Sequence, residues 1–193
     1  MPKRNRKKEH YGSILTINNE QLEINSTDTL GVYPDIIERI VEQLDICIAI
    51  HKRVLVVRFD LHLREYSDDN EVVSTFMTRQ KQRIKRTYNK TKDIGHVWVR
   101  ELEKAKAQHY HCALYIDGDV IQQPSKLLRQ IKVKWYKNGH CYIPEDCFYY
   151  IDKNNLEEER AKAIKRLSYL AKTRGKGYRK SQAKDSGASR LSR

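Results

Sequence analysis

The stretch Val54-Leu-Val-Val-Arg-Phe-Asp-Leu-His-Leu63 decides the fold class. It begins as an unbroken apolar run and then alternates apolar with polar residues, and it is rich in β-branched side chains. This pattern is typical of an inner strand of a sheet. We therefore expect a core built around this strand.

Segments of helical and strand periodicity lie on both sides of it. The helices, with apolar residues three or four apart, are predicted over residues 34–50, from a cap at 68–70 to about 86, over 124–137 and over about 156–173. Further strands are predicted as a short hairpin over 13–17 and 21–24, an antiparallel hairpin over 94–103 and 109–117, and short strands at 140–143 and 148–151.

From Val54 onward, the order of elements is strand, helix, strand, strand, helix, strand, helix. This order is typical of an α+β protein with a split βαβ topology, in which helices pack on a central antiparallel sheet. The first and third strands are central in that topology. The third strand begins at His109, so its histidines are expected on a rigid element.

Composition limits the class of protein and of partner. The chain has 193 residues and 38 Lys plus Arg against 25 Asp plus Glu, a formal net charge of +13. This length suits one domain, which we place at 13–173, between a basic flexible arm at 1–12 and a basic flexible tail at 174–193. Basic chains favour polyanions, because binding phosphates releases condensed counterions, and nucleic acid is the first expectation.

The chain shows no sign of export or membrane insertion. No run of about 18 apolar residues is present, and the basic N-terminus is not followed by the apolar region of a secretory signal. We therefore expect a cytoplasmic protein that does not bind membranes. Its cysteines form no C-x-x-C pair and are expected to be reduced thiols.

Basic residues gather in the second half of one predicted helix and towards the C-terminus. Their expected role is to contact nucleic-acid phosphates, although a solvated charged surface would look the same in the sequence. The candidates are Arg79, Arg83, Arg86, Lys165, Arg174 and Lys176.

His109 and His111 are the candidate metal ligands. Two residues apart on a strand, they leave the same face with Cα atoms about 6.5 Å apart. Neutral imidazole binds borderline divalent ions, and a carboxylate would add hardness suited to Mn²⁺ or Mg²⁺. Glu101 and Glu103 on the preceding strand share one parity, and the spacing alone does not choose between them. We favour Glu101.

Tyr169 is the candidate nucleophile. It lies on the polar flank of the last predicted helix, in one stripe with Lys165 and Lys172. A phenol is a poor nucleophile at neutral pH unless a cation stabilises the phenolate, and Lys172 can supply that charge. The chain has 12 tyrosines, so rival nucleophiles remain, namely Tyr149, Tyr150 and Tyr178.

These motifs resemble a known family. His109-Tyr110-His111, followed by Tyr169-Leu170-Ala171-Lys172, resembles the HUH endonucleases, in particular the single-tyrosine initiators of rolling-circle replication. With Val97-Trp98-Val99-Arg100-Glu101 and Arg58-Phe59-Asp60-Leu61-His62, the chain looks like the YagK/YfjJ-type replication-protein domain of filamentous phages and prophages. The resemblance covers roughly residues 50 to 175.

The resemblance implies an HUH-type version of the ferredoxin-like or RRM-like fold and a site-specific nickase. His109 and His111 would hold a divalent ion, Tyr169 would attack the scissile phosphate, and Lys172 would assist it. The expected product is a 5′-phosphotyrosine with a free 3′-hydroxyl that primes replication. The substrate would be single-stranded or hairpin origin DNA in a bacterial host. The sequence lacks G-x-x-x-x-G-K-[ST], so a separate helicase, and a polymerase, would be needed.

Two alternatives stay open. One is a zinc-stabilised nucleic-acid binder that uses the histidines with thiols, although the spacing lacks the usual paired rhythm. Its candidate ligands are His109, His111, Cys112, His140, Cys141 and Cys147. The other is a regulatory DNA-binding module with this fold and no catalysis.

Overall fold

The computed structural model describes residues 8–88, 91, 93–102, 107–177 and 183–191. Helices pack on an antiparallel sheet, which confirms the predicted α+β class. The helices are α1 (Pro34–Ile50), α2 (Glu71–Thr87), α3 (Pro124–Trp135) and α4 (Leu156–Ser168), followed by the 3₁₀ turn η1 (Tyr169–Ala171). The strands are β1 (Ile14–Ile17), β2 (Glu20–Glu23), β3 (Arg53–Leu63), β4 (Gly95–Glu101), β5 (His109–Asp117), β6 (Gly139–Tyr142), β7 (Phe148–Asp152) and β8 (Ser186–Ala188).

The main sheet has the strand order β6-β3-β5-β4-β8, and β7 also pairs with β3. Strands β6 and β7 share one edge of β3, β7 along its first half and β6 along its second. β3 pairs with β5 from Val54 opposite Asp117 to His62 opposite His109. The predicted central position of these two strands is therefore confirmed.

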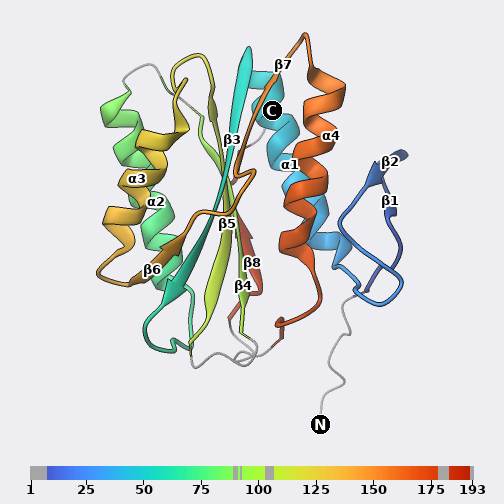
Figure 1. The fold of residues 1–193 in the computed structure, drawn as a ribbon, viewed down its shortest axis with the longest axis horizontal. Coiled ribbons are helices and arrows are strands. Elements are labelled where there is room, and N and C mark those ends of the chain that lie inside the picture. Colours follow the sequence, from blue (N-terminus) through green and yellow to red (C-terminus); the bar gives the residue numbers. More distant parts are fainter. Residues whose placement is uncertain (1–7, 89–90, 92, 103–106, 178–182, 192–193) are drawn as a thin grey trace.

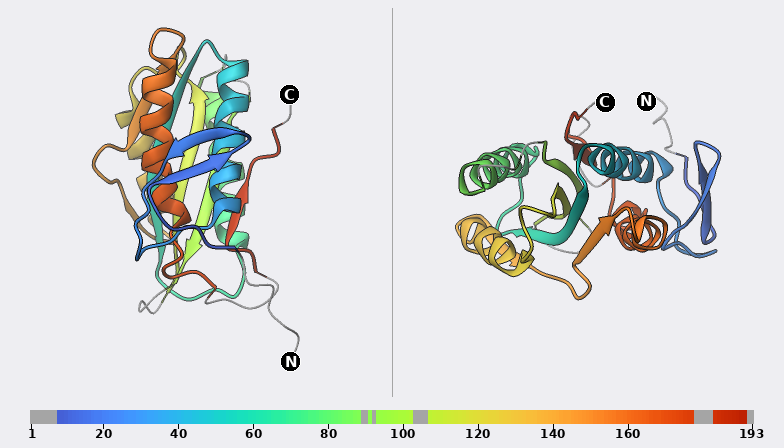
Figure 2. Two further views of the ribbon diagram at one scale, coloured as in Figure 1. Left: turned by 90° about the vertical axis from the view of Figure 1, so that its right-hand side faces the viewer. Right: turned by 90° about the horizontal axis from the view of Figure 1, so that it is seen from above.

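The two faces of the sheet carry different helix layers. Figures 1 and 2 show α2 and α3 on one side of the sheet and α1 and α4 on the other. Because side chains alternate along a strand, Val56 and Ala113 join the core under α1 and α4, whereas Val57 and Phe59 join the core under α2 and α3. This alternation fixes which polar residues share a face at the ends of the strands.

The last helix ends earlier than predicted. α4 stops at Ser168 and the chain continues as η1, so Tyr169 lies just beyond the helix and not within it. The segment just before α1 takes up the backbone groups that a longer helix would use. Tyr33 N–H donates to the carbonyl of Ala171, and Thr173 N–H donates to the carbonyl of Gly31.

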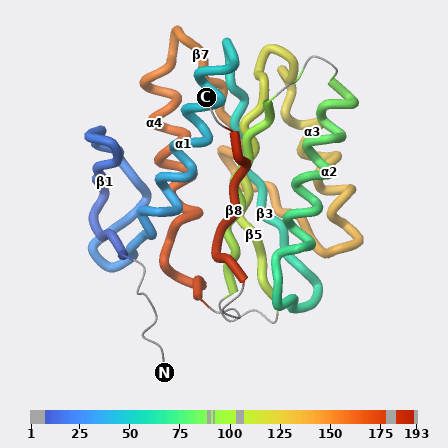
Figure 3. The backbone as a smooth tube through the Cα atoms, turned by 180° about the vertical axis from the view of Figure 1, so that it is seen from behind, coloured from blue at the N-terminus to red at the C-terminus, as the bar shows by residue number. Residues whose placement is uncertain are grey.

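The prediction of a flexible tail from residue 174 is wrong for its described part. Ser186–Ala188 forms β8, which pairs with Val97–Val99 of β4 and gives the sheet another strand. Figure 3 shows β8 from behind, along the middle of the molecule. Gly187 permits the close approach, because a Cβ there would lie 2.4 Å from the Trp98 ring. β8 is short and its residues are small, so the sequence did not indicate a strand there.

At the N-terminal end, β1 and β2 form the predicted antiparallel hairpin. The expected basic arm at 1–12 lies largely outside the described residues, which begin at residue 8. Within its described part, His10 forms a β-bridge with Val32. Val32 in turn bridges to Lys172, so these segments together hold the end of η1 in place.

Candidate metal and tyrosine site

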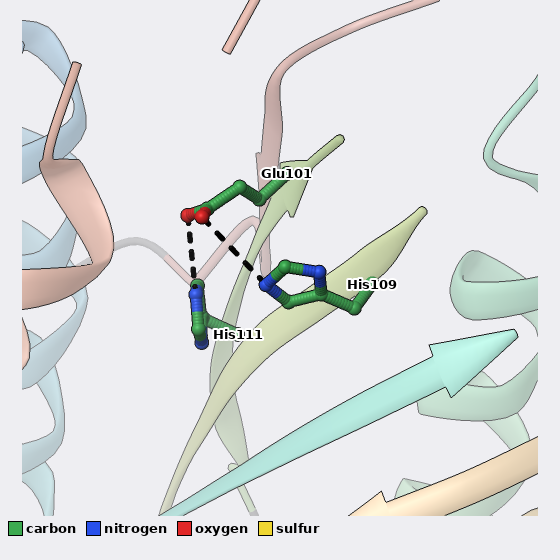
Figure 4. A group of neighbouring side chains, drawn as sticks. All are labelled: Glu101, His109 and His111. Atoms are coloured by element: carbon green, nitrogen blue, oxygen red, sulfur yellow. Dashed lines mark hydrogen bonds and ion pairs between the residues drawn. The ribbon is translucent and has the colours of Figure 1, made fainter. Parts of the chain in front are cut away.

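Glu101, His109 and His111 converge at one end of the sheet. Glu101 is the last residue of β4 and stands directly opposite His109, the first residue of β5. His111 Nε2 lies 3.2 Å from Glu101 Oε2, and His109 Nε2 lies 3.8 Å from Oε1. Figure 4 marks both contacts with dashed lines. One ligand atom from each of the three residues falls within 4.8 Å of the others.

These three residues fit a divalent cation. Two imidazoles and one carboxylate are ligands for borderline and harder divalent ions, and among the described residues this is the group that gathers enough ligand atoms. The sequence prediction of His109 and His111 with Glu101 is therefore supported by their convergence. The alternative, Glu103, lies outside the described residues.

Asp60 of β3 contacts the far side of His111. The two residues are register partners, and His111 Nδ1 lies 2.8 Å from Asp60 Oδ1. Carboxylates in this position fix the orientation of a ligand imidazole and leave Nε2 facing the cation site. Burial alone would lower the pKa of His111, but contacts with Asp60 and Glu101 outweigh it and raise the pKa. No role of Asp60 was predicted from the sequence.

Arg58 accompanies Asp60 on the same face of β3. The residue is only 4% exposed, and its Nη2 lies 3.5 Å from Asp60 Oδ2. Burial favours the neutral acid, but contact with His111 and the charge of Arg58 hold the pKa of Asp60 below its usual value. Arg58, Asp60 and His62 alternate with apolar residues along an inner strand. This pattern is the feature of the sequence that could have indicated them as site residues.

His62 extends the site across the sheet. It stacks on His109 with ring centroids 4.8 Å apart and an interplanar angle of 14°, and it faces His140 of β6. Burial and the neighbouring His111 lower the pKa of His109 to about 4. His109 is therefore a neutral imidazole at neutral pH, the form that binds a metal ion.

Lys176 was predicted to contact nucleic acid, and the structure contradicts this. Its side chain is fully buried, with Nζ 3.5 Å from Glu101 Oε2. Burial would raise the pKa of Glu101, but contact with His111 and the charge of Lys176 lower it to about 2. A left-handed backbone at Gly175 lets the chain pass against Glu101, because a Cβ there would lie 2.4 Å from Glu101 Cγ.

Tyr169 reaches this cluster from η1, which follows α4 in the helix layer on the same face of the sheet. Its ring meets His111 edge to face with centroids 5.6 Å apart. Two cations flank the same ring: Arg58 Cζ lies 4.7 Å and Lys172 Nζ lies 4.5 Å from its centroid. Burial lowers the pKa of Lys172, although the charge of Glu101 opposes this. The structure therefore brings together the predicted phenol, the predicted lysine and the metal-ligand cluster.

The rival tyrosines are placed differently. Tyr149 and Tyr150 belong to β7, and Tyr150 donates its hydroxyl hydrogen to the carbonyl of Ile121, 3.2 Å away. Tyr149 packs against the core under α1 and α4. Tyr178 lies outside the described residues.

The proposed zinc ligands are divided between the faces of the sheet, so the structure contradicts that set. Cys112 and Cys141 are buried in the core under α2 and α3, whereas His109 and His111 face the other layer. Burial raises the pKa of Cys141 to about 12, so its thiol stays protonated. Cys112, Cys141 and Cys147 are free cysteines.

The remaining predicted phosphate contacts are spread over the molecule. Arg79, Arg83 and Arg86 lie on α2, on the other layer from Tyr169. Lys165 is paired with Glu23 of β2. Arg174 is exposed beside the buried Gly175. The structure therefore does not gather these cations into one surface.

Comparison with known proteins gives the family. The family model described as YagK/YfjJ C-terminal domain matches residues 15–189. No curated protein and no solved structure matches the chain. In the described ranges, no helix has both the length and the apolar character needed to cross a membrane. A match over most of the chain, including every element from β2 to β8, shows that it belongs to the YagK/YfjJ C-terminal domain family.

Proposed function

We propose that this protein nicks and rejoins DNA at a specific site, using Tyr169 as the nucleophile beside a divalent metal ion. The observation that carries the proposal is the edge-to-face contact of the Tyr169 ring with His111, a member of the Glu-His-His cluster. A tyrosine that only filled the core would not be expected beside a metal-ligand cluster and two cations. Their convergence supports phosphodiester transfer to tyrosine.

Glu101, His109 and His111 would hold the metal ion, for which we propose Mn²⁺ or Mg²⁺. When bound, such an ion polarises the scissile phosphate and stabilises the negative charge that develops on it. Asp60 would keep His111 oriented through its contact with Nδ1.

The reaction is a transesterification. The Tyr169 oxygen forms a bond to phosphorus as the phenol loses its proton, and the bond from phosphorus to the 3′-oxygen breaks. That oxygen takes up a proton and leaves as a free 3′-hydroxyl, while the 5′ end stays on the protein as a phosphotyrosine. Attack by a 3′-hydroxyl on the phosphotyrosine reverses the step and rejoins the strand.

Lys172 and Arg58 would assist the phenol. Both place a positive charge within 5 Å of the ring centroid, so they favour negative charge on the oxygen as its proton leaves. Lys172 is only partly buried and can also contact a phosphate oxygen. Arg58 is buried and acts through its charge on the ring.

The proposed context is initiation of rolling-circle replication in the cytoplasm of a bacterial host. The free 3′-hydroxyl would prime synthesis on single-stranded or hairpin origin DNA. A helicase and a polymerase would come from other proteins, since this chain has no nucleotide-binding motif of the P-loop type.

The test is the formation of a covalent adduct. The full chain with Mn²⁺ is incubated with a 3′-labelled pool of randomised single-stranded DNA and with single-stranded circles, then analysed under denaturing conditions. Wild type and Tyr149→Phe are expected to carry label, whereas Tyr169→Phe and His111→Ala are not. Label retained by Tyr169→Phe would show that another tyrosine reacts. No adduct from wild type on any substrate would leave only a nucleic-acid-binding module.

A further inference from the structure

The two helix layers differ sharply in charge. α2 and α3 together carry nine basic side chains and one acidic side chain, Glu71, whereas α1 and α4 carry five basic and seven acidic. The sheet therefore separates a strongly positive layer from a slightly negative one. A positive face of this kind concentrates polyanions at its surface.

Internal pairing strengthens the contrast. On α4, Arg160 pairs with Glu20 and Asp45, and Lys162 and Lys165 also pair with acidic side chains. In the ranges that the structure describes, no ion pair involves any basic residue of α2 or α3. The charge on that layer is therefore available to a partner.

A groove between α2 and α3 focuses this charge. It has a volume of about 550 Å³, and both of its walls carry cations, Arg79 and Arg83 on α2 and Lys134 and Lys137 at the end of α3. Thr75 and Asn138 add hydrogen-bonding groups, and Asp69 and Glu71 place negative charge in the lining as well. Four cations on two walls can line both sides of a sugar-phosphate backbone.

The groove leads towards the metal cluster. Ser67 lines it, and its backbone N–H donates to the side chain of Gln108, the residue before His109. At its other side, Asn138 is followed at once by β6, whose His140 stands opposite His62. The groove and the site therefore meet at the same end of the sheet, although they lie on different faces.

We propose that this groove binds double-stranded DNA next to the strand that Tyr169 cleaves. The inference rests on the proposed function in taking DNA as the polyanion. Phe76 is the aromatic residue in the lining and is only 6% exposed, so the lining itself offers phosphate contacts but no surface on which unpaired bases could stack. Paired DNA needs only those phosphate contacts. A duplex stem held here would present its unpaired flank to the site.

The test is duplex binding by the full chain in EDTA, where no cleavage occurs. Fluorescence anisotropy compares a labelled duplex with a labelled single strand of the same length, over a range of salt. The groove variant carries Arg79→Ala, Arg83→Ala, Lys134→Ala and Lys137→Ala. The matched control removes the same charge elsewhere, with Arg39→Ala, Lys52→Ala, Lys153→Ala and Lys162→Ala. Circular dichroism and thermal unfolding check that both variants fold.

The groove variant is expected to bind the duplex about a hundredfold more weakly, because at about 0.1 M salt each lost phosphate contact forfeits close to tenfold and not all four need act together. The slope of log affinity against log salt concentration should fall in magnitude by about 2. The control should change affinity far less. Equal losses in both variants would show a net-charge effect and overturn the proposal.

Two further outcomes would also overturn it. One is that the groove variant loses as much affinity for the single strand as for the duplex. The other is that a polyglutamate peptide displaces the labelled duplex at a lower concentration than unlabelled duplex does. Tyr169→Phe separates the two proposals. If it binds the duplex as wild type does, a failure of adduct formation leaves the groove standing, and a failure of the groove leaves the adduct result untouched.

Discussion

Replacing Asp60 by Asn tests whether this carboxylate orients the metal ligand His111. The carboxylate oxygen lies 2.8 Å from His111 Nδ1, and both side chains are only 7% exposed. A full pair of unit charges at that distance would be worth about 6 kcal/mol at an effective dielectric constant of about 20. A metal-bound imidazole carries only part of a charge, so we expect a fraction of this, a loss of about 10- to 100-fold in Mn²⁺ affinity.

The substitution also affects stability, because it removes the counter-charge of Arg58, whose Nη2 lies 3.5 Å from Asp60. Breaking a buried pair costs about 3 kcal/mol, so the free energy of unfolding should fall by about that amount. Calorimetric Mn²⁺ titration and urea unfolding measure the two effects separately. The control is Asp119→Asn, which removes an exposed carboxylate 3.9 Å from Arg53 and should change neither quantity. Lower stability with unchanged Mn²⁺ affinity would refute the orienting role and leave Asp60 as a counter-ion.

Three further predictions concern buried groups. Lys176→Met removes a positive charge 3.5 Å from Glu101, so calorimetry should show Mn²⁺ affinity rising about tenfold; weaker binding would mean that the lysine positions the carboxylate. Burial, together with the charge of Lys81, lowers the pKa of His96 from 6.5 to about 3, so the unfolded chain takes up a proton first as the pH falls. The free energy of unfolding should then drop by on the order of 2 kcal/mol between about pH 6.5 and 5, and His96→Leu should flatten this slope in urea titrations; an unchanged slope would exclude His96 as its source. Gly139→Ala would place a Cβ 1.9 Å from the His62 carbonyl oxygen, so thermal unfolding should show a loss of about 2 kcal/mol or more, and an unaltered midpoint would contradict the β3–β6 register.

Local periodicity predicted much of the fold. The helix over Pro34–Ile50 and the strand over His109–Asp117 have the bounds that the sequence indicated, because the spacing of apolar residues reports on each element by itself. The alternation of side chains along a strand placed His109 and His111 on one face. Glu101 could be added to that face from the sequence because the hairpin that joins the two strands is local. The HUH-type nickase remains a prediction that the adduct experiment decides.

Tertiary structure decided what depends on contacts between distant segments. Asp60 meets His111 only because β3 pairs with β5 in one register, and side-chain alternation within either strand says nothing about that register. Lys176 looked like a surface charge, yet the turn at Gly175 buries it against Glu101. β8 can pair with β4 because Gly187 has no side chain to clash with the Trp98 ring. Hydrophobic periodicity in the sequence does not report such a steric fit. Periodicity shows which way a residue points within its own element, and only the packed chain shows what it meets there.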